Sequence, residues 1–344
     1  MRRRFPLVLL IALAGCAGVG SDRLPGKPAH HVAGGFRNLD PEFRRPGFLT
    51  RWAFLTRHGL GHLIAPRTFE PPRVAPDVVA LRSGRLNPSV TWVGHATLLV
   101  QLGGLNILTD PHWGQRTSPL PWAGPRRLAA PGIPFDALPR VDVVVLSHDH
   151  YDHLDVETLR RLVQAHDPLI LAPLGFKAWF AEEGPGRVEE LDWWQEHVVA
   201  GVRFVCLPAQ HWSQRSPWDL NRRLWASWAL LGPDRRLYFS GDTGYFDGFR
   251  EIGDRLGPFD VAAMAIGAYQ PAAVMRLVHL TPEQAVEAAG DLRARVLLGV
   301  HWGTFDLAEE PLDEPPRRML AEARRRGVPA AGAWILKIGE TRRW

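Results

Sequence analysis

Short apolar runs recur along the chain from residue 90 onward, and segments with helical periodicity lie between them. Each run is too short for a helix and rich in Val, Leu and Ile, so the runs predict buried strands. The predicted strands are residues 90–93, 98–102, 105–109, 141–146, 202–207, 227–231, 237–240, 261–265, 296–300 and 334–337. The predicted helices are residues 155–165, 174–183, 246–256, 282–292 and 311–326. Many strands with a few helices between them indicate a mixed α/β fold.

Two local signals refine this pattern. Gly103-Gly104 separates two predicted strands, which is typical of a hairpin and favours antiparallel content over a doubly wound parallel sheet. Thr281-Pro282-Glu283-Gln284 combines an N-cap hydroxyl, a proline at the first helical position and an amide three residues after the cap, so a helix is expected to begin there. No low-complexity linker divides residues 34–344, which we therefore predict to form one domain.

The first residues of the chain have the pattern of an export signal. Three arginines precede a short apolar run that cannot span a bilayer, and small residues precede Cys16. Leu13-Ala14-Gly15-Cys16 resembles the bacterial lipobox, in which cleavage leaves a lipidated cysteine as the new N-terminus. We therefore expect a signal peptide over residues 1–15, a lipidated N-terminus and tether over residues 16–33, and anchoring at the outer membrane, facing the periplasm. A plain signal peptide is the alternative.

The composition excludes several classes of protein. With 344 residues, 46% of them apolar, the chain can bury a sizeable core and is not disordered. The net charge is +5, but the arginines are scattered and form no basic stripe, so no nucleic-acid partner is expected. Two cysteines are too few for a disulfide framework or a multi-cysteine zinc site. The 14 histidines point instead to metal binding through imidazole.

A dense group of histidines and aspartates follows the predicted strand at residues 141–146. The run Ser147-His148-Asp149-His150-Tyr151-Asp152-His153 contains an H-x-H-x-D-H pattern. Adjacent loop residues point in different directions, so His148 and His150 can face one metal while Asp152 and His153 face a second. Imidazole nitrogens with one or two carboxylates suit Zn²⁺ first, with Mn²⁺ or Fe as alternatives.

Three more candidate ligands follow later strands. They are His211, Asp242 and His301. A carboxylate can bridge two cations with its two oxygens and a histidine cannot, so Asp242 is the natural shared ligand.

These segments resemble the metal-ligand motifs of the metallo-β-lactamase fold, an αββα sandwich. Further motifs resemble the N-acylphosphatidylethanolamine-hydrolysing phospholipase D family: Thr91-Trp92-Val93-Gly94-His95-Ala96-Thr97, Leu191-Asp192-Trp193-Trp194, Gly241-Asp242-Thr243-Gly244-Tyr245, Ile266-Gly267-Ala268-Tyr269 and His301-Trp302-Gly303-Thr304-Phe305. The resemblance implies a single catalytic domain with two Zn²⁺ per chain. It assigns His148, His150 and His211 to the first metal, Asp152, His153 and His301 to the second, and Asp242 to both.

The resemblance also implies a residue that acts on the substrate. His279 matches a family histidine near the phosphate and is expected, as an imidazolium, to contact the phosphate or to protonate the departing alkoxide; an ordinary helix-capping or surface histidine is the alternative. From the residues themselves, Asp152 is expected to orient the attacking water and Tyr151 to donate to the same phosphate. Val278 stands where the mammalian enzyme has glutamine, which removes one polar contact. His95 has no partner ligand nearby in the sequence, and we interpret it as a buried structural histidine or one that supports a ligand.

One aromatic segment, residues 211–228, combines four tryptophans with three arginines. One interpretation is an active-site rim that binds acyl chains and anionic headgroups; the other is a loop packed onto the core by its tryptophans. Trp193 and Trp194 are expected in the core.

The expected activity is phosphodiester hydrolysis. Two cations would activate a water for attack on phosphorus and convert an N-acylphosphatidylethanolamine-like phospholipid to a phosphatidic acid and an N-acylethanolamine. Two alternatives remain, a metal-dependent lactonase of the ascorbate-6-phosphate lactonase type and a non-catalytic envelope lipoprotein. Expected partners are a phospholipid substrate and the membrane, and a homodimer is left open.

Overall fold

The computed structural model describes residues 24–40, 43–64, 67–184 and 186–344. The predicted signal peptide, Cys16 and the first part of the predicted tether lie outside the described residues. The rest of the tether leads into a small hairpin of β1 (His31–Val32) and β2 (Gly35–Phe36). His30 and His31 both contact the carboxylate of Asp192, so packed structure begins a few residues before residue 34.

Two seven-stranded sheets form the centre of the described part of the chain. The first contains, in spatial order, β16 (Thr341–Arg343), β3 (Ser89–Gly94), β4 (Thr97–Leu102), β5 (Leu105–Thr109), β6 (Val143–Val145), β7 (Leu169–Pro173) and β8 (Arg187–Leu191). The second contains β15 (Ala333–Trp334), β14 (Val296–Val300), β13 (Val261–Ala265), β12 (Arg236–Phe239), β11 (Ser227–Leu231), β10 (Val202–Leu207) and β9 (Glu196–Val199).

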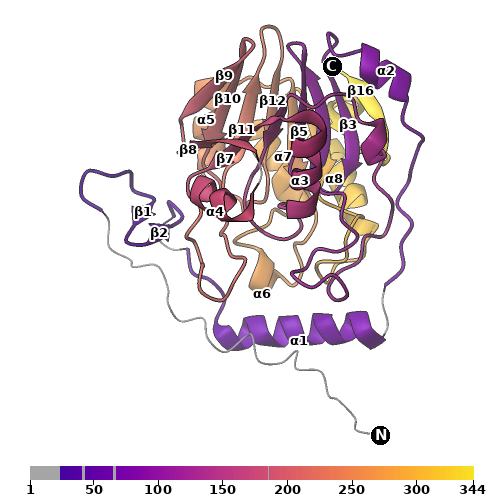
Figure 1. The fold of residues 1–344 in the computed structure, drawn as a ribbon. Helices are drawn as coiled ribbons and strands as arrows, with labels where there is room; N and C mark the ends of the chain where they lie inside the picture. Colours follow the sequence, from indigo (N-terminus) through magenta and orange to yellow (C-terminus); the bar gives the residue numbers. More distant parts are fainter. Residues whose placement is uncertain (1–23, 41–42, 65–66, 185) are drawn as a thin grey trace, which may run out of the picture.

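Helices cover the outer faces of the sheets (Figure 1). Those on the first sheet are α2 (Val78–Ser83), α3 (Val156–His166) and α4 (Phe176–Glu183). Those on the second sheet are α5 (Gly248–Leu256), α7 (Pro282–Asp291) and α8 (Glu314–Arg325). The short 3₁₀ turns are Phe135–Ala137 and Ala330–Gly332.

The strand sequences explain this layering. In β4, Leu98 and Val100 belong to the core between the sheets, whereas Leu99 belongs to the core under the first helical layer. Successive side chains of a strand point to opposite faces, so a strand covered on both faces must be apolar at every position. This arrangement confirms the predicted αββα sandwich.

The elements predicted from residue 90 onward are largely found. Gly103 and Gly104 form the turn between β4 and β5 with positive φ angles of 57° and 77°. Thr281 caps α7 through the full capping box. The predicted strand at residues 334–337 is wrong in extent, because β15 ends at Trp334.

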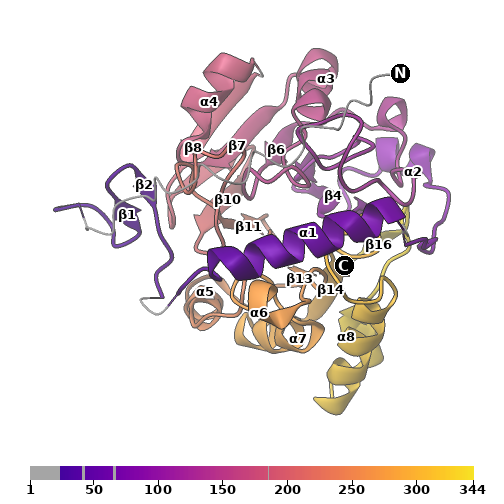
Figure 2. The ribbon, with the colours of Figure 1, turned by 90° about the horizontal axis from the view of Figure 1, so that it is seen from below.

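The sequence pattern missed β1, β2, β7, β8, β9, β16 and three helices. Two of these helices, α1 (Phe48–Ile64) and α6 (Ala272–Met275), lie across one end of the sandwich (Figures 1 and 2). Phe54 of α1 packs there with Met275 of α6. The strands that precede the candidate ligands all end at one edge of the sandwich: β5 and β6 run parallel, and β10, β12 and β14 share one direction.

Candidate metal centre

The structure brings all seven predicted ligands together at this edge. His148, His150, Asp152 and His153 lie in the loop after β6, and His211, Asp242 and His301 follow β10, β12 and β14. Five of the seven are at most 3% exposed, and His150 and Asp152 face the one open side. Segments far apart in the sequence therefore build one buried cluster of nitrogen and oxygen donors.

Three histidines form the first half of the cluster. Nδ1 of His150 lies 2.9 Å from Nε2 of His148 and 3.2 Å from Nε2 of His211. Oδ2 of Asp242 lies 3.9 Å from Nε2 of both His148 and His211. Burial, and to a lesser extent the neighbouring histidines, lowers the pKa of His148 and His211 well below the usual value. Their rings are therefore neutral and keep a lone pair.

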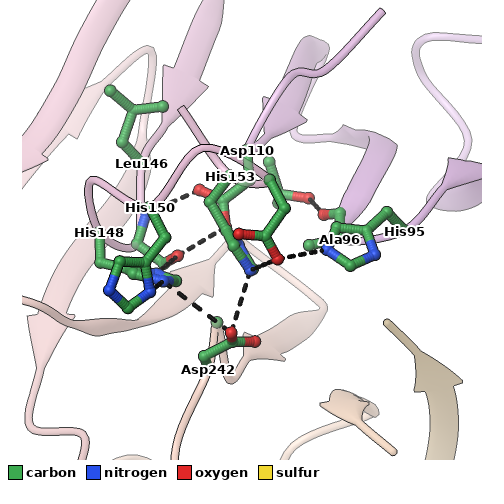
Figure 3. Close-up of polar contacts among 12 residues, drawn as sticks. His95, Ala96, Asp110, Leu146, His148, His150, His153 and Asp242 are labelled. Carbon is green, nitrogen blue, oxygen red and sulfur yellow. Dashed lines mark hydrogen bonds and ion pairs between the residues drawn. The ribbon is translucent and has the colours of Figure 1, made fainter. Parts of the chain in front are cut away.

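The second half combines two histidines with two carboxylates. Nε2 of His153 and Nε2 of His301 lie 3.2 Å apart. Oδ2 of Asp152 is 3.3 Å and 3.4 Å from these two nitrogens, and the Asp242 oxygens are 3.1 Å from each. Asp242 therefore contacts both halves, in the shared position expected of it (Figure 3).

The two carboxylates are ionised. Burial alone would raise the pKa of Asp152 and of Asp242, but the neighbouring histidines outweigh it and hold both values well below the usual range. Burial alone would lower the pKa of His301, but the two carboxylates outweigh it and raise the value to about 9. The second half of the cluster is therefore the more strongly charged.

The donors fit divalent metal ions. Nε2 of His150 is buried without a hydrogen-bond partner among the described residues, although such an atom normally has one. Ring nitrogens of neighbouring histidines face one another at 2.9–3.2 Å. Two lone pairs at this distance do not attract each other unless a cation or a proton lies between them. A set of imidazole and carboxylate donors suits Zn²⁺, Mn²⁺ or Fe.

Two supporting residues complete the cluster. Asp110 is fully buried after β5, and its carboxylate accepts hydrogen bonds from His153 Nδ1 at 2.7 Å, Ser147 Oγ at 2.6 Å and Ser147 N at 2.7 Å. The sequence analysis missed Asp110, although an aspartate directly after a predicted strand is the same signal that indicated Asp242. His95 Nε2 lies 2.9 Å from Asp152 Oδ2, so the support interpreted from the sequence fits its position.

A cavity of about 470 Å³ opens over the cluster. Its polar lining includes His150, Asp152, Asp242 and His279, and its apolar lining includes Phe54, Val274, Met275, Val278 and Leu307. Most of this apolar surface comes from the α1 and α6 region at the end of the sandwich (Figure 2). The cavity thus joins the candidate ligands to a surface suited to apolar groups.

His279 and Tyr151 both line this cavity. Nδ1 of His279 is 3.8 Å from Oδ2 of Asp242, and burial lowers the pKa of His279 to about 4. The ring is therefore neutral near pH 7 rather than the imidazolium considered from the sequence. Tyr151 Oη donates to the carbonyl of Arg215 at 2.9 Å, so its proton is directed away from the cluster in this arrangement.

The interpretation of residues 211–228 as an active-site rim is wrong for Trp225, Trp228 and Arg223. Trp225 and Trp228 are fully buried in the core, and Arg223 is buried in ion pairs with two aspartates. Trp212 does line the cavity, and Trp218 is 61% exposed. The alternative interpretation, a loop packed onto the sandwich, describes this segment better. Trp193 is buried as expected, and Trp194 is only partly so.

The sequence of residues 105–302 matches the profile described as "Beta-lactamase superfamily domain". The chain belongs to the β-lactamase superfamily. An uncharacterized protein of Mycobacterium tuberculosis is 43% identical over 300 residues, which cover 84% of this chain and 78% of the relative. The N-acyl-phosphatidylethanolamine-hydrolyzing phospholipase D 1 of Caenorhabditis elegans is 44% identical over 243 residues, which cover 67% of this chain and 68% of the relative.

Solved structures share the fold at low sequence identity. A possible metal-dependent hydrolase from Veillonella parvula superimposes with a TM-score of 0.62 and 16% identity, over 75% of this chain and all of the other. At this identity the likeness concerns the fold alone. Among the described residues, none of the helices has the length and apolar character needed to cross a membrane.

Proposed function

We propose that this superfamily member is a dinuclear zinc-dependent phosphodiesterase of phospholipase D type. Its substrates are N-acylphosphatidylethanolamine-like phospholipids, and its products are a phosphatidic acid and an N-acylethanolamine. The observation that carries the proposal is the position of Asp242, whose carboxylate contacts both halves of a seven-donor cluster on the floor of a cavity with an apolar wall. The similarity to the Caenorhabditis elegans phospholipase supports the choice of substrate.

The seven donors divide into two sets in this proposal. His148, His150 and His211 hold one ion, Asp152, His153 and His301 hold the other, and Asp242 serves both. When bound, two Zn²⁺ ions supply Lewis acidity toward the phosphodiester and a water of lowered pKa; Mn²⁺ or Fe would supply the same chemistry.

The chain's own residues orient the reactants. Asp152 is ionised, so it accepts a hydrogen bond from the attacking water, and His95 Nε2 at 2.9 Å fixes the carboxylate that does so. His279 is neutral near pH 7 and faces the cavity, so its N–H donates to a phosphoryl oxygen or to the departing alkoxide. Tyr151 joins this contact only after its hydroxyl turns away from Arg215.

The cavity wall accounts for a lipid substrate. Phe54, Val274, Met275 and Leu307 present apolar side chains beside the donors, and burying each methylene of an acyl chain against such a surface contributes about 0.8 kcal/mol. A soluble lactone would make little use of this surface, which favours the lipid over the lactonase alternative.

The decisive experiment is a set of assays on the purified mature protein. Metal content per chain is measured first, and then turnover of N-acylphosphatidylethanolamine, other phosphodiesters and lactones is compared side by side. Asp242→Asn should abolish turnover, whereas the exposed Asp234→Asn should not change it. Lactone turnover without phosphodiester turnover would replace the proposal by the lactonase, and fewer than one tightly bound metal would favour the non-catalytic lipoprotein.

The envelope location is part of the same proposal. A signal peptide over residues 1–15 and a lipidated Cys16 would anchor the enzyme at the outer membrane, beside its substrate. Cys16→Ser should release the protein from the membrane fraction, and continued attachment would show that the lipobox interpretation is wrong. The homodimer stays a prediction, which light scattering of the purified protein checks.

A further inference from the structure

Two arginines from the segment before the catalytic motifs line the cavity over the metal cluster. Arg45 precedes α1, and Arg51 lies in its first turn. Both are partly buried, and in the described part of the chain neither guanidinium forms a hydrogen bond or ion pair with a carboxylate. Nε of Arg51 is buried without any hydrogen-bond partner there. Donors of this kind, left unpaired beside a cavity, are suited to an anion.

The positions of the two arginines make this pairing with an anion more favourable. The first turn of α1 contains no acidic residue, so the positive end of the helix dipole adds to the two charges. Burial and the charge of Arg51 lower the pKa of Arg45 to about 10, which shows that the two cations repel each other. An anion between them would relieve this repulsion.

The pair lies next to the metal cluster. The guanidinium of Arg45 stacks on the Trp212 ring, with its carbon 4.3 Å from the ring centroid. The Trp212 ring also contacts the candidate ligand His150, whose ring centroid is 4.2 Å away in an edge-to-face contact. One indole therefore separates the arginine from the cluster, and a single small ligand can contact both.

From this geometry we infer that Arg45 and Arg51 form an anion subsite that selects phosphodiesters with a second anionic group on the head group. This inference rests on the proposed function, because it takes the reacting phosphodiester to lie at the metal cluster. That diester carries one negative charge, and an N-acylated ethanolamine head group adds none. A carboxylate or phosphate a few bonds from the phosphorus would reach the arginines, so the preferred substrate is an N-acylated phospholipid with an acidic head group.

The test compares two non-hydrolysable phosphonate analogues that differ only in the head group. One carries a carboxylate, and the other carries its methyl ester. Calorimetry on the zinc-loaded protein should show 10- to 100-fold tighter binding of the carboxylate, as expected for one charge-assisted interaction in a sheltered site. Arg45→Gln and Arg51→Gln should each remove most of this preference, and Arg51→Lys should keep part of it.

A matched control lies on the same helix. Arg57 does not line the cavity, and it pairs with Glu309 at the surface, so Arg57→Gln should leave the preference unchanged. Circular dichroism checks that each variant is folded. Equal binding of the two analogues by the native protein, or a preference that survives in both glutamine variants, overturns the subsite and leaves the proposed function intact. If neither analogue binds, the proposed function fails and the subsite fails with it.

Discussion

Replacing Asp110 by asparagine tests whether the cluster depends on its buried support. Asp110 uses both oxygens to accept three hydrogen bonds, one from His153 and two from Ser147. Asparagine has one acceptor oxygen and an amide group that can only donate. In Asp110→Asn, therefore, either His153 or Ser147 must face a donor instead of an acceptor.

The magnitude follows from the His153 contact. Donation from Nδ1 to Asp110 fixes the ring so that Nε2 points toward Asp152 and Asp242. Loss of such a supporting partner typically lowers metal affinity about 10- to 100-fold, or about 1.4 to 2.7 kcal/mol. Because the carboxylate is fully buried, unfolding of the metal-free protein should also become easier by about 2 to 4 kcal/mol.

The assay is a Zn²⁺ titration of metal-free protein against a chelating dye, with urea unfolding of the same samples. Asp142→Asn is the matched control: its carboxylate accepts from Asn106 N at 2.9 Å, at the end of β6 opposite the cluster. Asp142→Asn should alter stability but not Zn²⁺ affinity. The reasoning is refuted if Asp110→Asn binds Zn²⁺ as tightly as the native protein, or if both variants lose affinity equally.

Three further predictions concern metal, pH and the N-terminal segment. Chelation should lower the melting temperature of the native protein, and Asp242→Asn should show a smaller drop on calorimetry, because ligands that bind only the folded state stabilise it. Burial, with the charge of Arg127, lowers the pKa of His112 to about 4 against 6.5 in the unfolded chain, so stability should fall as the pH falls through this interval. The native protein should lose free energy of unfolding between pH 7 and pH 5, and His112→Asn should reduce this loss by about 2 kcal/mol, as measured by urea unfolding. An unchanged loss in the variant would contradict this. The Asn38 side chain forms two hydrogen bonds with the backbone of His211, of 3.0 and 2.8 Å. Asn38→Ala should therefore lower the free energy of unfolding by about 1 to 2 kcal/mol and weaken Zn²⁺ binding. The exposed Asn87→Ala should change neither quantity.

The candidate metal cluster was predictable because each candidate ligand stands at a fixed place in the local sequence. A buried strand must be apolar along its length, so a histidine or aspartate directly after it, as in Val300-His301, is visible without knowledge of the fold. The same reasoning could have found Asp110. It could not have found the partner of His95, because Asp152 is 57 residues away and only the sandwich brings the two together.

The cavity wall was not predictable for a different physical reason. Helix α1 buries Phe54, but its exposed positions include Leu49 and Trp52, so the separation of an apolar from a polar face that marks a surface helix is missing. The apolar lining also combines α1 with α6, a helix of four residues, which is too short for any periodicity to be recognised.

The candidate ligands and part of the cavity wall come from different parts of the chain, which bears on substrate specificity. The matched superfamily domain spans residues 105–302 and contains every candidate ligand, whereas Arg45, Arg51 and Phe54 all lie before it. The segment before the domain is also tied to the cluster, because Asn38 holds the backbone of His211. A change at Arg45, Arg51 or Phe54 can therefore alter the wall of the cavity without touching the candidate ligands, whereas a change at Asn38 cannot. If the proposed function holds, we expect the choice of phosphodiester to vary with residues 45–54 and metal binding to depend on the loops at the ends of the strands.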